Sequence, residues 1–94
     1  MLKHKHTTAM GFRETQIGTA YLRAAVNHVA AFPDEMRPAV TKDVYPYVAV
    51  MFETTINAVE RGIRYAIHQS TLSGTNREVI PDLAMRVKDG EFNE

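Results

Sequence analysis

Apolar residues recur at helical spacing along most of this chain, and no segment shows the period-two alternation of a half-buried strand. This spacing is clearest over residues 15–31, and the apolar residues there are Ile17, Tyr21, Leu22, Ala25, Val26 and Val29. A long amphipathic helix is therefore expected to end at Phe32-Pro33, because proline disfavours the α conformation in the residue before it. The pattern predicts an all-α fold.

The remaining helices are separated by residues that interrupt or cap helices. At most one helical turn fits between Pro33 and Pro38, and a helix over residues 41–52 then tolerates Pro46 near its first turn. After a break at 53–55, a helix capped by Thr55 is expected to run to about residue 72, where Ser73-Gly74 ends it. A last helix begins either at a cap formed by Thr75 or Asn76, or near Ile80 if Pro81 cannot lie inside it. We expect a compact bundle of about four or five helices.

Length and charge limit the chain to one domain with a local functional surface. The 94 residues suffice for a single core. We expect a flexible basic arm over residues 1–10, a folded domain over 11–88 and an acidic, disordered tail over 89–94. Eleven Lys and Arg balance eleven Asp and Glu, which excludes a strongly basic coat protein. Because of this balance, any nucleic-acid surface must be a local patch, although the body without the tail's three acidic residues is mildly basic.

Nothing in the sequence favours an enzyme, a metal site or a cofactor. The chain has no Cys, no glycine-rich phosphate loop and no arrangement typical of a catalytic triad. His4 and His6 could ligate a metal, but two histidines in an arm are usually solvated, and we expect His28 to be a partly buried structural residue. No segment reaches the roughly 20 apolar residues that a membrane span needs. We expect a cytoplasmic protein without catalytic residues.

The two helices on either side of the break at 53–55 have the layout of a helix-turn-helix. We expect Val48, Ala49 and Phe52 of the first helix to face inward, and Val59, Gly62 and Ile63 of the second to hold the crossing. The second helix then presents a polar stripe, which consists of Asn57, Glu60, Arg61, Arg64 and His68.

The residue types in this stripe suit the major groove of DNA. Arginine can bond bidentately to guanine, asparagine to adenine, and glutamate can accept from cytosine N4. Thr55 and the helix N-terminus suit phosphate, and His68 could bind phosphate when protonated. The structural alternative is an ordinary i,i+4 surface pair between Glu60 and Arg64, with Arg61 and His68 simply solvated.

Residues 41–67, TKDVYPYVAVMFETTINAVERGIRYAI, resemble a known family in one register without gaps. The family is the DNA-binding effector domain of the master response regulator that initiates sporulation in endospore-forming bacteria. The matching residues are Thr41-Lys42, Tyr45-Pro46, Ala49, Phe52, Thr54-Thr55, Val59-Glu60-Arg61, Ile63-Arg64 and Ala66-Ile67. Gly11, Gly18 and Tyr21-Leu22-Arg23 upstream, and Thr75-Asn76, Glu78 and Ile80 downstream, extend the resemblance over about residues 11–88.

The resemblance implies a sequence-specific transcriptional regulator whose helix from about residue 55 to 72 reads a short box in double-stranded DNA. Glu60, Arg61 and Arg64 match family positions that contact bases and phosphates. Two partner hypotheses follow and stay open at this point: self-association on tandem boxes and, since this sequence contains no receiver domain, a separate response-regulator protein. The chain departs from the family where Ala58 replaces an arginine and Asn57 a serine, and where the segment around Ser73-Gly74 is much shorter.

The alternative is a protein-interaction module that keeps the fold but has lost DNA binding. The missing arginine at Ala58, the neutral overall charge and an exposed Ile56 favour it, because non-specific DNA affinity comes mainly from neutralised phosphates. The two hypotheses differ in whether Arg61 and Arg64 are free or are paired within the protein.

Overall fold

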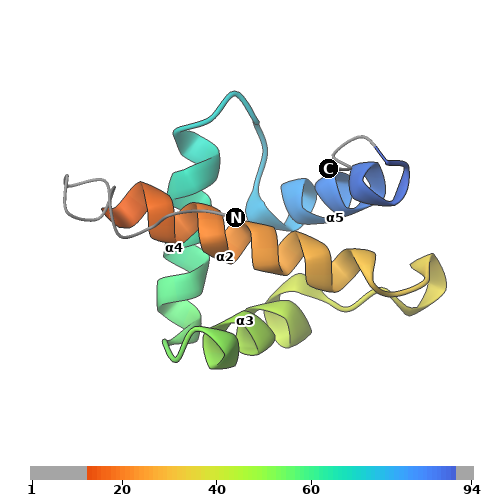
Figure 1. Cartoon of the computed structure of the whole chain (residues 1–94), viewed down its shortest axis with the longest axis horizontal. Coiled ribbons are helices and arrows are strands. Elements are labelled where there is room, and N and C mark those ends of the chain that lie inside the picture. The colour runs from red at the N-terminus through yellow and green to blue at the C-terminus, as the bar shows by residue number, and fades with distance from the viewer. Residues whose placement is uncertain (1–12, 91–94) are drawn as a thin grey trace.

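Four α-helices account for most of the described chain, as Figure 1 shows. The structure is a computed structural model that describes residues 13–90, with side chains from Ile17 onward. The helices are α2 (Arg13–Ala30), α3 (Tyr45–Met51), α4 (Ile56–His68) and α5 (Asn76–Lys88). A 3-10 turn, η1 (Asp34–Met36), and a π-helical segment, η2 (Val40–Val44), lie between α2 and α3. The described residues contain no strand, which confirms the all-α prediction, whereas the arm at 1–10 and tail residues 91–94 lie outside them.

Helix α2 is the element against which the other helices pack. Figure 1 shows α4 crossing α2 near its N-terminal end, while α5 lies against the other half of α2 and α3 lies below. None of the helices within residues 13–90 is long and apolar enough to cross a membrane. The arrangement is a small bundle around one core.

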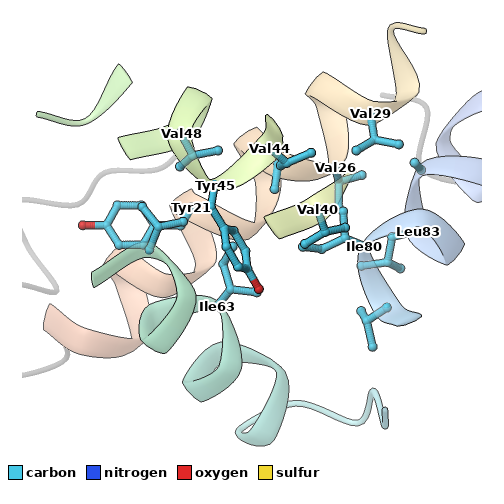
Figure 2. Close-up of a cluster of buried hydrophobic side chains, with 14 of the residues drawn as sticks. Tyr21, Val26, Val29, Val40, Val44, Tyr45, Val48, Ile63, Ile80 and Leu83 are labelled. Carbon is cyan, nitrogen blue, oxygen red and sulfur yellow. The ribbon is translucent and has the colours of Figure 1, made fainter. Parts of the chain in front are cut away.

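The core consists of buried apolar side chains contributed by every helix, and Figure 2 shows how they converge. Val26 and Val29 come from α2, Val40 and Val44 from η2, Tyr45 and Val48 from α3, Ile63 from α4, and Ile80 and Leu83 from α5. Ile63, Ile80, Val44, Val48 and Val59 are almost fully buried. Burying such a side chain contributes about 1.5–3 kcal/mol. The predicted inward positions Val48, Ala49, Val59 and Ile63 are confirmed.

Two glycines bring the backbones of α2 and α4 together. A Cβ added to Gly18 would lie 2.2 Å from the carbonyl oxygen of Gly62, and a Cβ on Gly62 would lie 2.8 Å from the Tyr21 ring. Neither position has room for a larger residue without separating the helices. Gly62 therefore lies at the crossing of α4 with α2 and not, as the sequence predicts, at the crossing with the first helix of the helix-turn-helix.

The helix expected over residues 41–52 begins as a π-helix. The backbone N–H groups of Val44 and Tyr45 donate to the carbonyls of Ala39 and Val40, five residues earlier. This wider turn suits Pro46, which has no N–H and whose ring would clash with the carbonyl four residues before it in a regular α-helix. The prediction that Phe52 faces inward is wrong in part, because its ring contacts Tyr21 edge-on at 5.1 Å but remains partly exposed.

The helix expected to reach residue 72 ends at His68. The hydroxyl of Ser70 donates to the Ile67 carbonyl (2.7 Å) and accepts from the backbone N–H of Leu72 (3.0 Å), and these local bonds replace further helical ones. Gly74, at φ +121°, precedes the next helix rather than closing α4. The residues between His68 and Thr75 therefore form a loop.

Helix α5 begins at Asn76 and contains Pro81, so the expectation of a start near Ile80 is wrong. Thr75 is the N-cap of a complete capping box: its side chain accepts from the backbone N–H of Glu78, and the Glu78 carboxylate accepts from the backbone N–H of Thr75. This cap and the burial of Ile80 and Leu83 offset the hydrogen bond that Pro81 cannot make.

The other end of α5 is attached to the connector after α2. The Lys88 ammonium donates to the carbonyl of Phe32 (2.6 Å) and to the Asp34 carboxylate (2.8 Å). The same contact lowers the pKa of Asp34 below its usual value of 3.8. Both ends of α5 are therefore anchored by polar contacts.

The glycine crossing generates a stability prediction. We expect Gly18→Ala to lower the free energy of unfolding by about 1–3 kcal/mol, because the added methyl group overpacks the contact with Gly62. This loss should occur although alanine favours a helix over glycine by about 1 kcal/mol. Urea unfolding followed by circular dichroism measures it, with Asn27→Ala, on the exposed face of α2, as a control expected to be neutral or slightly stabilising. An unchanged or higher stability of Gly18→Ala would show that α2 and α4 do not meet at this point.

Candidate nucleic-acid interface

Helix α4 has one buried face and one polar face. Val59, Ile63, Ala66 and Ile67 are buried against the core. Asn57, Arg61, Arg64 and His68 are exposed, and Glu60 is half-buried at the edge of the same face. At 3.6 residues per turn these five polar residues lie on one side of the helix. The polar stripe predicted from the sequence is therefore present on a single helix face.

The N-terminus of α4 is capped and accessible. The Thr55 hydroxyl accepts a hydrogen bond from the backbone N–H of Ala58 (3.0 Å), which confirms Thr55 as the N-cap. The first N–H groups of a helix have no intrahelical acceptor, and only one of them is used here by the cap. Ile56 and Asn57 are exposed beside it. The helix end can therefore donate to an anion.

Helices α3 and α4 are joined by a tight turn at the predicted break. Glu53 has φ +55°, and the backbone N–H of Thr54 donates to the Ala49 carbonyl (2.9 Å). The turn leads from the buried Ala49 on α3 directly to the cap of α4. This short connection is what a helix-turn-helix requires.

The two arginines of α4 differ in their partners. Arg64 Nη1 donates to the Glu60 carboxylate one turn earlier, so the i,i+4 pair expected as the structural alternative is present. Such a solvent-accessible pair contributes only a few tenths of a kcal/mol. Among residues 17–90, Arg61 forms no ion pair. The stripe thus contains one paired and one unpaired guanidinium.

Shallow hollows flank the stripe on both sides. One, of about 590 Å³, lies between α2 and α4; its lining includes Tyr21, Ala58, Arg61 and Tyr65. The other, of about 630 Å³, lies between α4, the loop before α5 and the start of α5; its lining includes Glu60, Arg64 and Arg77. The polar face of α4 therefore forms a ridge between two depressions.

A buried hydrogen-bond network lies under the second hollow. The Asn76 side-chain amide donates to the Tyr45 hydroxyl (2.9 Å) and to the backbone carbonyl of Glu60 (3.1 Å). Burial raises the pKa of Tyr45 above 10.0; the hydrogen bond from Asn76 opposes this shift, and the nearby Glu60 charge adds to it. Three elements, α3, α4 and α5, meet in this network.

The sequence predicts the polar stripe but not the buried hydrogen-bond network that lies under it. From the sequence, Asn76 is a cap candidate and part of the family resemblance, whereas its side chain bonds residues 31 and 16 positions away along the chain. The one signal in the sequence is an amide beside a second cap candidate, Thr75. Tyr65, exposed beside Arg61 in the first hollow, was likewise not singled out.

The family model described as "Sporulation initiation factor Spo0A C terminal" matches residues 4–91. The chain belongs to this family. Spo0A C-terminal domains are DNA-binding effector domains of transcription regulators, so the chain is a DNA-binding regulator in general terms. The match confirms the resemblance found in residues 41–67. No solved structure matches the chain.

Tyr45 generates a pH prediction for this Spo0A C-terminal domain. Its pKa is higher in the folded than in the unfolded chain, so the stability that this difference contributes is complete below pH 10 and is lost as the pH rises through the folded pKa. We expect the free energy of unfolding to fall more steeply above about pH 10 in the wild type than in Tyr45→Phe. Urea unfolding at a series of pH values measures both slopes. If the free energy of unfolding fell equally steeply with pH in both proteins, Tyr45 would not be a buried phenol with a raised pKa.

Proposed function

We propose that this protein is a sequence-specific DNA-binding regulator that uses α4 as its recognition helix in the major groove. Asn57, Glu60 and Arg61 face the base edges, whereas Thr55 and Arg64 contact phosphates. His68, at the C-terminal end of α4, contacts phosphate when it is protonated. The observation that carries the proposal is the polar stripe on the face of α4 opposite the buried Val59 and Ile63.

The helix ends and charges support these roles. The capped N-terminus of α4 leaves backbone N–H groups available to a phosphate, to which the positive end of the helix dipole also contributes. Arg61 is exposed and forms no ion pair among residues 17–90, so it can reach a guanine edge without losing an internal partner. The two hollows leave space on either side of the ridge for the walls of a groove.

The primary experiment measures binding by fluorescence anisotropy. The full 94-residue chain is titrated into a randomised duplex pool and into a duplex carrying the sporulation-type box, each at two salt concentrations. We expect binding that weakens with salt, because phosphate contacts release counterions, together with a preference for a defined sequence. Binding without any sequence preference would contradict the specific reading of bases by α4.

Arg61 gives the sharpest test of the base contacts. We expect Arg61→Ala to weaken binding to the preferred duplex by about 1–3 kcal/mol and to relax the preference at one base pair, as the loss of a bidentate contact does. Arg23→Ala removes the same charge from the exposed face of α2 and is the matched control, expected to have little effect. Equal affinities and equal base preferences for wild type and Arg61→Ala would exclude Arg61 as a base contact.

Self-association on tandem boxes and a separate response-regulator partner extend this proposal. A duplex with two adjacent boxes tests the first: cooperative binding relative to a single box supports self-association. Addition of a phosphorylated receiver protein to the same titration tests the second, because a true partner should shift the binding curve.

One observation favours the alternative of a protein-interaction module. Tyr47, Val50 and Met51 expose apolar side chains on α3, and Val50 is 79 % exposed. Contiguous exposed apolar side chains are typical of protein contacts. Absence of DNA binding at low salt would favour this alternative over a regulator that acts on DNA.

A further inference from the structure

Apart from the tyrosines Tyr21 and Tyr45, Asn76 is the only polar residue that is buried among residues 17–90, with 7 % of its surface exposed. A buried amide costs free energy unless its groups are hydrogen-bonded, and both hydrogens of its side-chain amide are used here. One is donated to Tyr45 on α3 and the other to the backbone carbonyl of Glu60 on α4. A single side chain of α5 thus connects the two helices of the proposed helix-turn-helix.

The local role of Asn76 in α5 does not account for this side chain. Capping of α5 is completed by Thr75 and Glu78, whose reciprocal hydrogen bonds form the capping box. An apolar residue at the first position of α5 would leave that cap intact. The two long-range bonds therefore require another explanation.

The bond to Glu60 is made at the edge of the polar stripe, where the stripe meets the buried face of α4. Within the described residues it is the only hydrogen bond that another helix makes to α4. The other contacts of α4 are apolar side chains such as Val59 and Ile63, whose burial is not directional, and the close approach of Gly62 to Gly18 on α2. The Asn76 bond adds a directional restraint on the rotation of α4 about its own axis.

We propose that Asn76 is a positioning residue that sets the orientation of the α4 stripe and thereby its selectivity for a DNA sequence. This inference rests on the proposed function of α4. A helix with its side chains is about 10–12 Å across, so a rotation of about 10° moves a side-chain tip by roughly 1 Å. Binding sites must hold their groups within about 0.5 Å, so such a rotation suffices to misplace Arg61 at a base edge.

The central experiment compares Asn76→Leu with Tyr45→Phe. Asn76→Leu is similar in volume and removes both bonds, whereas Tyr45→Phe removes one bond and leaves the Asn76 contact with Glu60. Each full-length variant is titrated with the preferred duplex and with the randomised pool, after circular dichroism has shown that it is folded at the assay temperature. The readout is the affinity for the preferred duplex divided by the affinity for the randomised pool. A loss of stability alone does not change this ratio as long as the protein is folded.

We expect Asn76→Leu to lower this ratio at least about fivefold while affinity for the randomised pool changes less than about twofold. Tyr45→Phe should keep the wild-type ratio, because the bond to α4 remains. A wild-type ratio in folded Asn76→Leu would overturn the proposal. If Asn76→Leu does not fold, Asn76→Asp replaces it, because a carboxylate cannot donate to the Glu60 carbonyl.

A second measurement separates this inference from the proposed function. Residual dipolar couplings of the backbone amides report the orientation of α4 relative to α2 and α5 without any DNA. We expect the α4 couplings to differ from the wild type in Asn76→Leu and not in Tyr45→Phe. A wild-type protein without sequence preference would refute the proposed function, and unchanged α4 couplings would refute the positioning role by themselves.

Discussion

The close backbone contact of Gly18 and Gly62 is the constraint on which the rest of the structure depends. Because no side chain separates α2 from α4 at this point, Val59 and Ile63 reach the core on one side of the crossing. Within residues 13–90, no helix covers the opposite face of α4. The same contact that stabilises the bundle therefore leaves Arg61 and Arg64 exposed as a ridge.

Much of the helical arrangement follows from local sequence signals. The sequence predicts the end of α4 and the start of α5 less well, because side chains there compete with the hydrogen bonds of the helix backbone. Periodicity identified α2, and the residue types at 53–55 identified the turn before α4. Ser70 ended α4 four residues early because its hydroxyl satisfied the local backbone groups. Pro81 lies inside α5 because the capping box of Thr75 and the burial of Ile80 outweigh its missing hydrogen bond. A sequence shows both competing effects but not which is larger.

In the candidate interface, too, features that depend on nearby residues could be predicted from the sequence, whereas features that depend on distant residues could not. The polar stripe could be predicted because its residues lie on one helix, where spacing alone determines the face. The network under it could not, because the partners of Asn76 are 16 and 31 residues away. In the sequence, Asn76 and Thr75 are two equivalent cap candidates, and only the fold assigns the cap to Thr75 and the buried contact to Asn76.

The ion pair between Glu60 and Arg64 is compatible with DNA binding on energetic grounds. Both side chains reach solvent, so breaking the pair costs a few tenths of a kcal/mol. In the proposed complex, a phosphate offers Arg64 another charge-assisted acceptor, and the exchange frees the Glu60 carboxylate to accept from a cytosine amino group. The exchange of partners therefore costs little. Arg61 forms no ion pair within residues 17–90, so in the proposed complex it is the guanidinium of α4 that contacts a base without first giving up an internal partner.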